Sequence, residues 1–240
     1  MATLNYSASR AKSNPGDTPV LVIGQVQNLQ TIGFAPLKCK LEPLVTEKVR
    51  TKTAVNQSSE SVESTFLNTC PVSPYVQLWS SAVESLNPSG SETVNLYLNS
   101  AAVASLPAKC SRHNAPSRGH AITKMVKAFS TGQSDSVVVV CDRADVYASG
   151  CAVARAFSKY SLKTKSGTPR PASTAVINVE FVLTNDDVVS QEELDALNHA
   201  AEGIQTAAVI VDTPCSDMHT DAFIEVSKAV GANTLTRNDI

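Results

Sequence analysis

Runs of apolar residues and stretches of alternating polarity predict the strands of this chain. Residues 20–23 form a continuous apolar run closed by Gly24, which is typical of a strand buried on both faces of a sheet. Residues 137–141 form a second and clearer run of this kind. Apolar and polar side chains alternate over residues 94–98 and 175–183, as expected of strands whose two faces differ.

Apolar residues at three- and four-residue spacing predict helices between these strands. Residues 117–129 can form an amphipathic helix, and residues 145–157 predict a helix with small residues on its packing face. Residues 75–86 are compatible with a further helix. Strands that alternate with helices predict an α/β fold, with a mixed or parallel sheet flanked by helices on both faces.

The C-terminal part of the chain predicts two helices separated by a proline. Ser190 and Glu193 have the spacing of a capping box, and Pro214 ends the first helix because the residue before a proline avoids the α conformation. The apolar stripe of this helix comprises Leu194, Leu197, Ala201, Ile204, Ala208 and Val211. Thr220 is the expected cap of the second helix and Gly231 its expected left-handed stop.

Two segments predict irregular structure. Residues 1–19 are polar, contain the turn sequence Asn-Pro-Gly-Asp at 14–17, and predict a flexible arm. Residues 50–77 are rich in Ser, Thr and Asn in their first part and predict an exposed loop insertion. We therefore expect residues 20–189 to form the α/β domain.

Net charge changes this picture because its sign differs along the chain. Residues 1–190 contain 18 Lys and Arg against 13 Asp and Glu, whereas residues 191–240 contain 2 against 9. The acidic tail is therefore expected to belong to a separate structural unit. Its charge is compatible with docking on a basic surface or with an ordinary solvated helix face.

A cluster of cations is a candidate anion-binding or nucleic-acid-binding surface. No acid occurs between Glu92 and Asp135, and the cations in this stretch are Lys109, Arg112, Arg118, Lys124 and Lys127. A second acid-free stretch, residues 146–179, includes Arg155. Such clusters can neutralise phosphates. The sequence pI of about 6.1 and the lack of interleaved aromatic residues favour a solvated face instead, so both interpretations stay open.

The residues that carry chemistry do not form a recognisable catalytic or metal site. No two of the ten glycines have the close spacing of a phosphate-cradling loop, and the six cysteines include no C-x-x-C pair. The four histidines lack metal-helix spacing and are interpreted as surface or capping residues. The adjacent carboxylates Asp186-Asp187 and Glu192-Glu193 flank a helix start, where the dipole favours negative charge. We therefore assign no catalytic residue and no metal ligand to this chain.

The sequence also constrains the compartment. It shows no secretory signal at its N-terminus and no apolar segment of about 18 residues that would span a membrane. The unpaired cysteine spacing is typical of a reducing environment. We expect a cytoplasmic protein.

The joint between the two C-terminal helices, IVDTPCSDMHTDAF at residues 210–223, resembles a joint in the leucyl aminopeptidase family of metallo-exopeptidases, in its probable aminopeptidase-like branch. The similarity continues backwards through short segments in family order. They are Lys40-Leu41-Glu42-Pro43, Tyr97-Leu98-Asn99, Leu106-Pro107, Ser111-Arg112-His113-Asn114, Ala154-Arg155-Ala156-Phe157 and Val179-Glu180-Phe181.

The resemblance implies a macro-domain-like N-terminal domain, a connecting helix at residues 190–213 and the start of a catalytic domain at residues 214–240. The family's metal ligands lie in later Gly-Lys-Gly…Asp-Ser-Gly-Gly and Asn-Thr-Asp-Ala-Glu-Gly-Arg segments, which this sequence does not contain. Asp212 replaces the family's usual Asn, and residues 215–217 replace Pro-Asn-Glu, which leaves substrate preference open.

For a full-length relative, the resemblance implies a peptide substrate, a hexamer and two divalent metals, zinc or manganese, which polarise the scissile carbonyl and supply hydroxide. This chain alone is expected to bind no metal and to be inactive. Two alternatives from other functional classes stay open. One is a module that binds nucleotides or nucleic acid, and the other is a truncated partner that joins full-length subunits.

Overall fold

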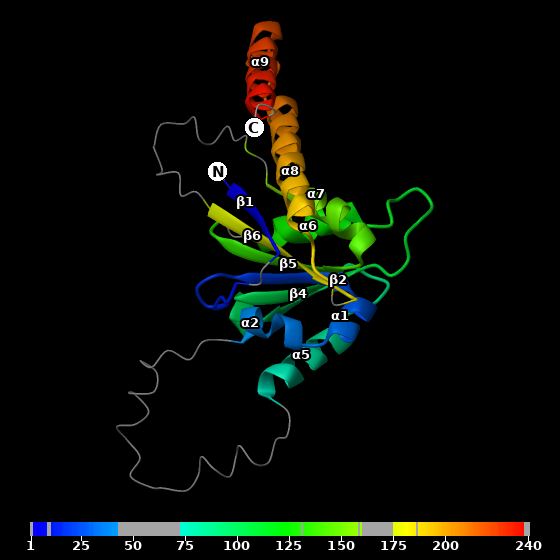
Figure 1. The fold of residues 1–240 in the computed structure, drawn as a ribbon. Helices are drawn as coiled ribbons and strands as arrows, with labels where there is room; N and C mark the ends of the chain where they lie inside the picture. The colour runs from blue at the N-terminus through cyan, green and yellow to red at the C-terminus, as the bar shows by residue number, and fades with distance from the viewer. Residues whose placement is uncertain are drawn as a thin grey trace, which may run out of the picture.

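The computed structural model describes residues 2–8, 11–42, 73–130, 132–157, 159, 175–185 and 187–237, the side chains of the last five excepted. These residues form a three-layer α/β body, in which helices cover both faces of a central sheet, and a helical extension (Figure 1). The architecture confirms the expected mixed sheet and its helical tail.

The sheet has six strands in the order β1-β6-β5-β2-β4-β3. Their bounds are β1 Ala2–Ser7, β2 Val20–Gln25, β3 Thr93–Leu96, β4 Ala101–Leu106, β5 Asp135–Cys141 and β6 Ala175–Leu183. Every neighbouring pair is parallel except β3 and β4, which are antiparallel. The prediction for 94–98 is wrong at its end, because Tyr97 and Leu98 have positive φ angles of 49° and 54° and leave the strand.

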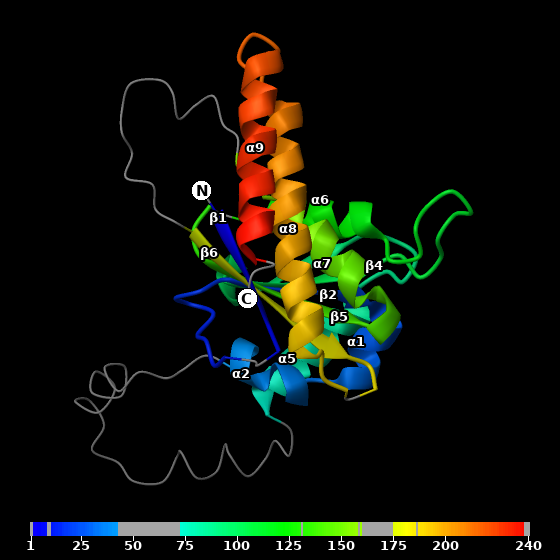
Figure 2. The ribbon, with the colours of Figure 1, turned by 45° about the horizontal axis from the view of Figure 1, so that its top comes forward.

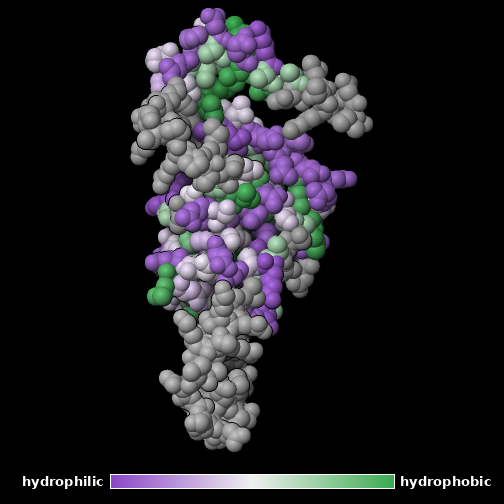
Figure 3. Space-filling view, turned by 90° about the vertical axis from the view of Figure 1, so that its left-hand side faces the viewer, coloured by the Kyte–Doolittle hydropathy of each residue, from purple (hydrophilic) through white to green (hydrophobic). Residues whose placement is uncertain are grey.

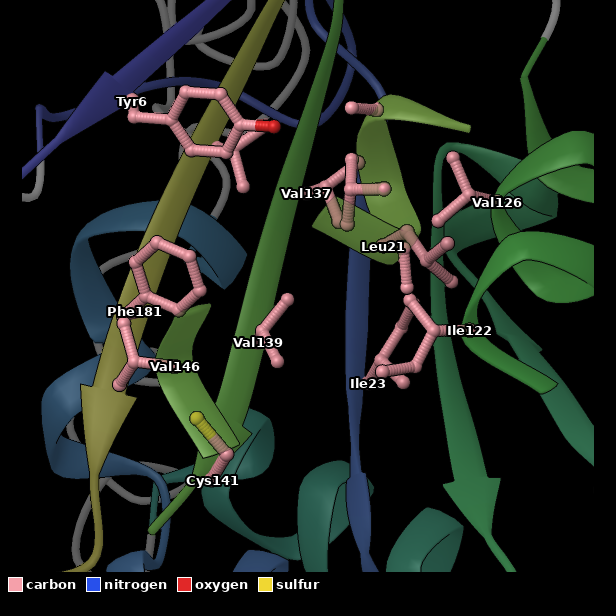
Figure 4. Packing of buried hydrophobic residues seen from close by; sticks show 14 of the residues in the cluster. Tyr6, Leu21, Ile23, Ile122, Val126, Val137, Val139, Cys141, Val146 and Phe181 are labelled. Atoms are coloured by element: carbon pink, nitrogen blue, oxygen red, sulfur yellow. The ribbon is translucent and has the colours of Figure 1, made fainter. Parts of the chain in front are cut away.

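The central strands β2 and β5 are buried on both faces, as their apolar runs predict. Leu21 and Ile23 enter the core between the sheet and one helical layer, whereas Val20 and Val22 enter the core on the opposite face. Figure 4 shows the first of these cores, where side chains of β2 and β5 meet Ile122 and Val126 of α6. The side chains of a continuous apolar run therefore pack against both helical layers.

The helices divide between the two faces (Figures 1 and 2). The first layer contains α6 Gly119–Phe129, α7 Val146–Ala154 and α8 Gln191–Asp212, which confirms the helices predicted from 117–129, 145–157 and 190–213. The second contains α1 Val26–Ile32, the short α2 Lys38–Leu41 and α5 Pro74–Ser85, with the 3-10 turn η1 Ala35–Leu37 between α1 and α2. Residues 50–72, most of the expected insertion at 50–77, lie outside the described residues, and residues 74–77 begin α5.

The expected arm at residues 1–19 is wrong for its first part, because Ala2–Ser7 forms β1 beside β6. Tyr6 is 4% exposed, its ring stacks on Phe181 with centroids 6.4 Å apart, and its hydroxyl donates a 2.9 Å hydrogen bond to the Gly150 carbonyl. Burial raises the Tyr6 pKa well above its usual range. One aromatic side chain thus holds a short, otherwise polar strand against the body.

The α8 helix joins the body through residues up to Gln205, which is 4% exposed. Its capping box is formed, with Ser190 accepting from the Glu193 amide, and it ends at Asp212 as Pro214 predicts. Leu194, Leu197 and Ala201 are buried in the first core. The predicted apolar stripe is not buried as far as its last member, since Val211 is 81% exposed. The second half of α8 therefore extends beyond the sheet (Figure 1).

The second C-terminal helix, α9 Thr220–Arg237, differs from its prediction at both ends. Thr220 is its first residue, and the His219 ring accepts a hydrogen bond of 3.5 Å from the Ala222 amide instead. The helix continues through Gly231, whose φ is not positive and which therefore forms no left-handed stop. No described element packs extensively against α9. Figure 3 shows hydrophobic residues interspersed with hydrophilic ones on this face of the extension. None of the described helices is long and apolar enough to cross a membrane.

We predict that Gly150→Ala loosens the attachment of α8. A Cβ at Gly150 would lie 2.6 Å from Cδ2 of Leu197 and 3.3 Å from Cζ of Phe181, both in the first core. Overpacking of this kind costs about 1–3 kcal/mol of unfolding free energy, measurable by urea denaturation. Gly203→Ala is the control, because nothing lies within 4 Å of its Cβ position, and it should stabilise by about 0.5–1 kcal/mol. Equal stability of Gly150→Ala and the parent would contradict the prediction.

Candidate anion-binding pocket

A cavity of about 350 Å³ lies beyond the carboxyl end of β4, where the loop at residues 107–118 leads into α6. Three elements line it. The lining comprises Pro107, Lys109, Cys110, Ser111, His113, Asn114, Ala115, Ser117 and Arg118 from the loop, Gly119, His120 and Ala121 from α6, and Arg155 after α7. The carboxyl ends of parallel strands are the usual place for ligands in α/β sheets.

Arg118 holds the loop in this shape. Its backbone takes the left-handed conformation, with a φ of 54°, immediately before α6. Its guanidinium donates to the carbonyls of Pro107 and Pro116, and to that of Ala108 at 2.6 Å. One side chain therefore joins the two ends of the loop, and its charge is met by neutral carbonyl oxygens.

The structure brings together two of the five cations predicted as an anion-binding surface. Lys109 and Arg118 line the cavity, whereas Arg112 lies in the same loop outside the lining. Lys124 and Lys127 are exposed further along α6, also outside the lining. The five cations therefore do not form one lining.

Arg155 also lines the cavity, although it belongs to the second acid-free stretch, residues 146–179. It reaches the cavity because α6 packs against α7, where the Thr123 hydroxyl donates a 2.7 Å hydrogen bond to the Ala152 carbonyl. Its proximity to Lys109 depends on this tertiary contact between segments far apart in the sequence. The feature of the sequence that could have indicated a shared site is the absence of acids from both stretches.

The histidines lie as follows. His113 and His120 are exposed and line the cavity, which adds hydrogen-bonding rings to its cations. His219 caps α9, and His199 lies on α8. Within the described ranges, no group of three or more His, Cys, Asp or Glu side chains is arranged to hold a metal ion.

Asp187 and Glu193, from the two pairs of adjacent carboxylates, stabilise the start of α8. Arg143 donates to Asp187 at 2.5 Å and to Glu193 at 2.9 Å. The Val188 amide, and then Arg143, hold the pKa of Asp187 below its usual range, while the Ser190 amide and hydroxyl lower that of Glu193. Both groups are therefore ionised and structural at neutral pH. Asp186 lies outside the described residues.

The buried thiols are poor nucleophiles. Burial raises the pKa of Cys141 to about 12, and burial also raises the pKa of Cys151. A thiol with a raised pKa supplies little thiolate at neutral pH. These two cysteines therefore act as small apolar side chains of the first core.

Two of the short family-like segments meet inside the protein. Nζ of Lys40 lies 2.6 Å from Oε1 of Glu180, and their side chains are only 3% and 2% exposed. Lys40 comes from α2 and Glu180 from β6, so the pair joins the second helical layer to the sheet. This contact is structural and not part of the cavity.

Comparison with known protein families gives a match over most of the α/β body. Residues 18–166 match the sequence family described as "M17 aminopeptidase N-terminal domain 2". The chain belongs to the M17 aminopeptidase family. This finding confirms the resemblance to leucyl aminopeptidases.

Relatives of this M17 chain carry aminopeptidase names. It is 36% identical over 231 residues to "Probable aminopeptidase NPEPL1" of Mus musculus, and to the protein of that name of Homo sapiens. Each match covers 95% of this chain and 38% of the relative. "Leucine aminopeptidase 1" of Caenorhabditis elegans is 28% identical over 162 residues, 65% of this chain and 30% of the relative. The chain thus spans 38% of the length of its NPEPL1 relatives.

Solved structures show the same fold. The Caenorhabditis elegans leucine aminopeptidase superposes with a TM-score of 0.66 at 19% identity, over 97% of this M17 chain and 40% of that chain. A leucyl aminopeptidase from Trypanosoma brucei in complex with actinonin gives 0.54 at 18% identity, over 92% and 38%. The superposed lengths include the helical extension as well as the α/β body.

Proposed function

We propose that this chain is the N-terminal part of an aminopeptidase that releases N-terminal amino acids from peptides. The observation that carries the proposal is the match of residues 18–166 to the M17 N-terminal domain. The superposition on a leucine aminopeptidase over 97% of the chain supports it. The activity belongs to the whole protein, of which relatives contain far more than this chain spans.

The domain boundaries follow from this proposal, with one change from the sequence prediction. The α/β domain begins at β1, because that strand belongs to the sheet, and ends near residue 189. Residues 190–213 form the connecting helix, and residues 214–240 begin the catalytic domain. The exposed end of α8, where Val211 is 81% exposed, suits a connection that leads away from the first domain.

M17 aminopeptidases are metal-dependent. The described residues of this chain do not fit a metal site, since no group of three or more potential ligands is arranged around one point. We therefore assign no catalytic step to them. Two divalent ions, zinc or manganese, would be held by residues of the whole protein outside this described part.

Three further properties complete the proposal. The whole protein acts in the cytoplasm, assembles as a hexamer, and recognises peptides with a preference that the joint residues Asp212 and Cys215 influence indirectly. Their change from the usual family residues supports a distinct preference. The N-terminal domain would contribute to assembly or regulation instead of bond cleavage.

The test compares this 240-residue chain with the product of the complete reading frame. Each is loaded with manganese or zinc and assayed on aminoacyl-coumarin amides with different side chains, and its assembly is measured by analytical ultracentrifugation. We expect hydrolysis and a hexamer for the complete product, and no hydrolysis for the 240-residue chain. A metal-loaded, folded complete product that cleaves none of the amides would overturn the proposal.

A further inference from the structure

The first turn of α6 has two backbone N–H groups, on residues that line the cavity, for which the described part of the chain supplies no acceptor. The N–H groups of Ala121 and Ile122 both bond to the Arg118 carbonyl, at 2.9 and 3.2 Å. Those of Gly119 and His120 have no acceptor among the described residues, and Arg118 provides no side-chain cap. An α-helix of this length carries partial positive charge at its first turn, where anions bind.

Ser117 is an independent sign of a ligand. This residue is only 9% exposed and lines the cavity. Its hydroxyl makes no hydrogen bond to any described residue, and it is not among the fully enclosed oxygens without a partner. The hydroxyl therefore keeps accessible surface, on a residue that lines the cavity. A hydroxyl with accessible surface at a cavity wall can bond to a molecule in the cavity, and no described residue competes for that bond.

The charge of the cavity is positive and not balanced by its own walls. Lys109, Arg118 and Arg155 line it, and no Asp or Glu of the described part of the chain does. No ion pair within the described residues includes Lys109 or Arg155, and Arg118 bonds only to carbonyls. Three cations around free amides and a hydroxyl match the oxygens and charge of a phosphate group.

We propose that this cavity binds a small phosphate-bearing molecule, with its phosphate against the amides of Gly119 and His120, the Ser117 hydroxyl, and the Lys109 and Arg155 side chains. The volume of about 350 Å³ is within the range of small-molecule sites. A nucleic acid fits less well. Among the residues that the structure describes, no Phe, Tyr or Trp lines the cavity to stack on bases, and Lys124 and Lys127 lie outside it.

The test uses the full 240-residue chain and isothermal titration at low salt. The probes are inorganic phosphate, AMP and glucose 6-phosphate, with a single-stranded oligonucleotide for comparison. We expect saturable binding of at least one phosphate compound at one site per chain. Equal affinity for all three assigns the site to the phosphate group alone, whereas tighter binding of AMP or of the sugar phosphate identifies the class of the attached group.

Variants locate the site. Arg155→Ala should weaken phosphate binding about tenfold or more, and Ser117→Ala about fivefold, as expected for losing a charged and a neutral hydrogen bond. Lys127→Ala is the matched control, since it removes an exposed cation of α6 outside the cavity, and it should change affinity less than about twofold. Circular dichroism melts check that each variant is folded.

Three results would overturn the proposal. The first is no saturable binding of any of the three phosphate compounds to the folded chain. The second is equal weakening by Lys127→Ala and Arg155→Ala, which would indicate a diffuse surface charge instead of a site. The third is tighter binding of the oligonucleotide than of every small phosphate, with losses of similar size on removing Lys124, Lys127 or Lys109, which would assign the region to nucleic acid.

Discussion

Replacing Lys40 with Met should destabilise this M17 chain by about 3–5 kcal/mol. The substitution keeps the volume of the side chain but leaves the Glu180 carboxylate buried without the ammonium group that lies 2.6 Å away. Removing one partner of a buried pair costs far more than the pair itself contributes, because the remaining charge has lost its hydration as well. Urea denaturation of the purified chain measures the loss.

The double variant Lys40→Met with Glu180→Leu separates the two effects. Replacing both charges with apolar groups should recover most of the stability, since no uncompensated ion then remains in the core. Lys38→Ala is the surface control. Its 3.6 Å pair with Glu42 is well exposed, so its removal should cost less than about 1 kcal/mol. A Lys40→Met chain as stable as the Lys38→Ala chain would show that the buried pair is dispensable.

Replacing Tyr6 with Ala should cost about 3–5 kcal/mol, as removal of a large buried aromatic side chain does. Tyr6 is 4% exposed, stacks on Phe181 and donates to the Gly150 carbonyl, so its loss removes the one fully buried side chain of β1. We expect faster hydrogen exchange at the amides of β1 as well as a lower denaturation midpoint.

Two substitutions separate the contributions of Tyr6. Tyr6→Phe keeps the ring and removes the 2.9 Å hydrogen bond, for an expected loss of about 1 kcal/mol. Tyr147→Ala, at a side chain that is 54% exposed on α7, should change stability by less than about 1 kcal/mol. Unchanged stability and exchange in Tyr6→Ala would mean that β1 is not part of the cooperative fold.

The α8 helix connects these stability predictions to the proposed function. Its first half is anchored in the first core by Leu194 and Leu197, against Gly150 and Phe181. Its second half leads to α9, with Phe223 and Ile224 remaining 49% and 43% exposed. Substitutions that loosen the anchored half should therefore alter how the proposed catalytic domain is held, through geometry and without touching the chemistry.

Local patterns allowed much of the fold to be predicted. The runs at 20–23 and 137–141 identify β2 and β5, because a strand covered on both faces must be apolar at every position. The capping box at Ser190 and the break at Pro214 place the ends of α8, because both act through neighbouring backbone atoms. The resemblance of the joint and the short segments to leucyl aminopeptidases led to the correct family.

Other features depended on contacts between distant segments. β1 is too short and polar to be recognised from the sequence alone. It forms because β6 pairs with it, and because Tyr6 stacks on Phe181 and donates to the Gly150 carbonyl. Gly231 is compatible with a helix stop by sequence, yet α9 continues through it. A glycine alone therefore does not determine where this helix ends.

The cavity also combines features that the sequence indicates with features that only the packing determines. Composition alone placed Lys109 and Arg118 in a basic stretch, because the absence of acids can be read along the chain. The sequence by itself thus determined the family, the central strands, the α8 boundaries and the sign of the local charge. Only the tertiary structure decided that Lys40 contacts Glu180, that Tyr6 anchors an edge strand, and that Arg155 lines the same cavity as Lys109. The physical reason is that these contacts depend on how the helices and strands pack in space, and spacing along the chain does not encode which distant side chains become neighbours.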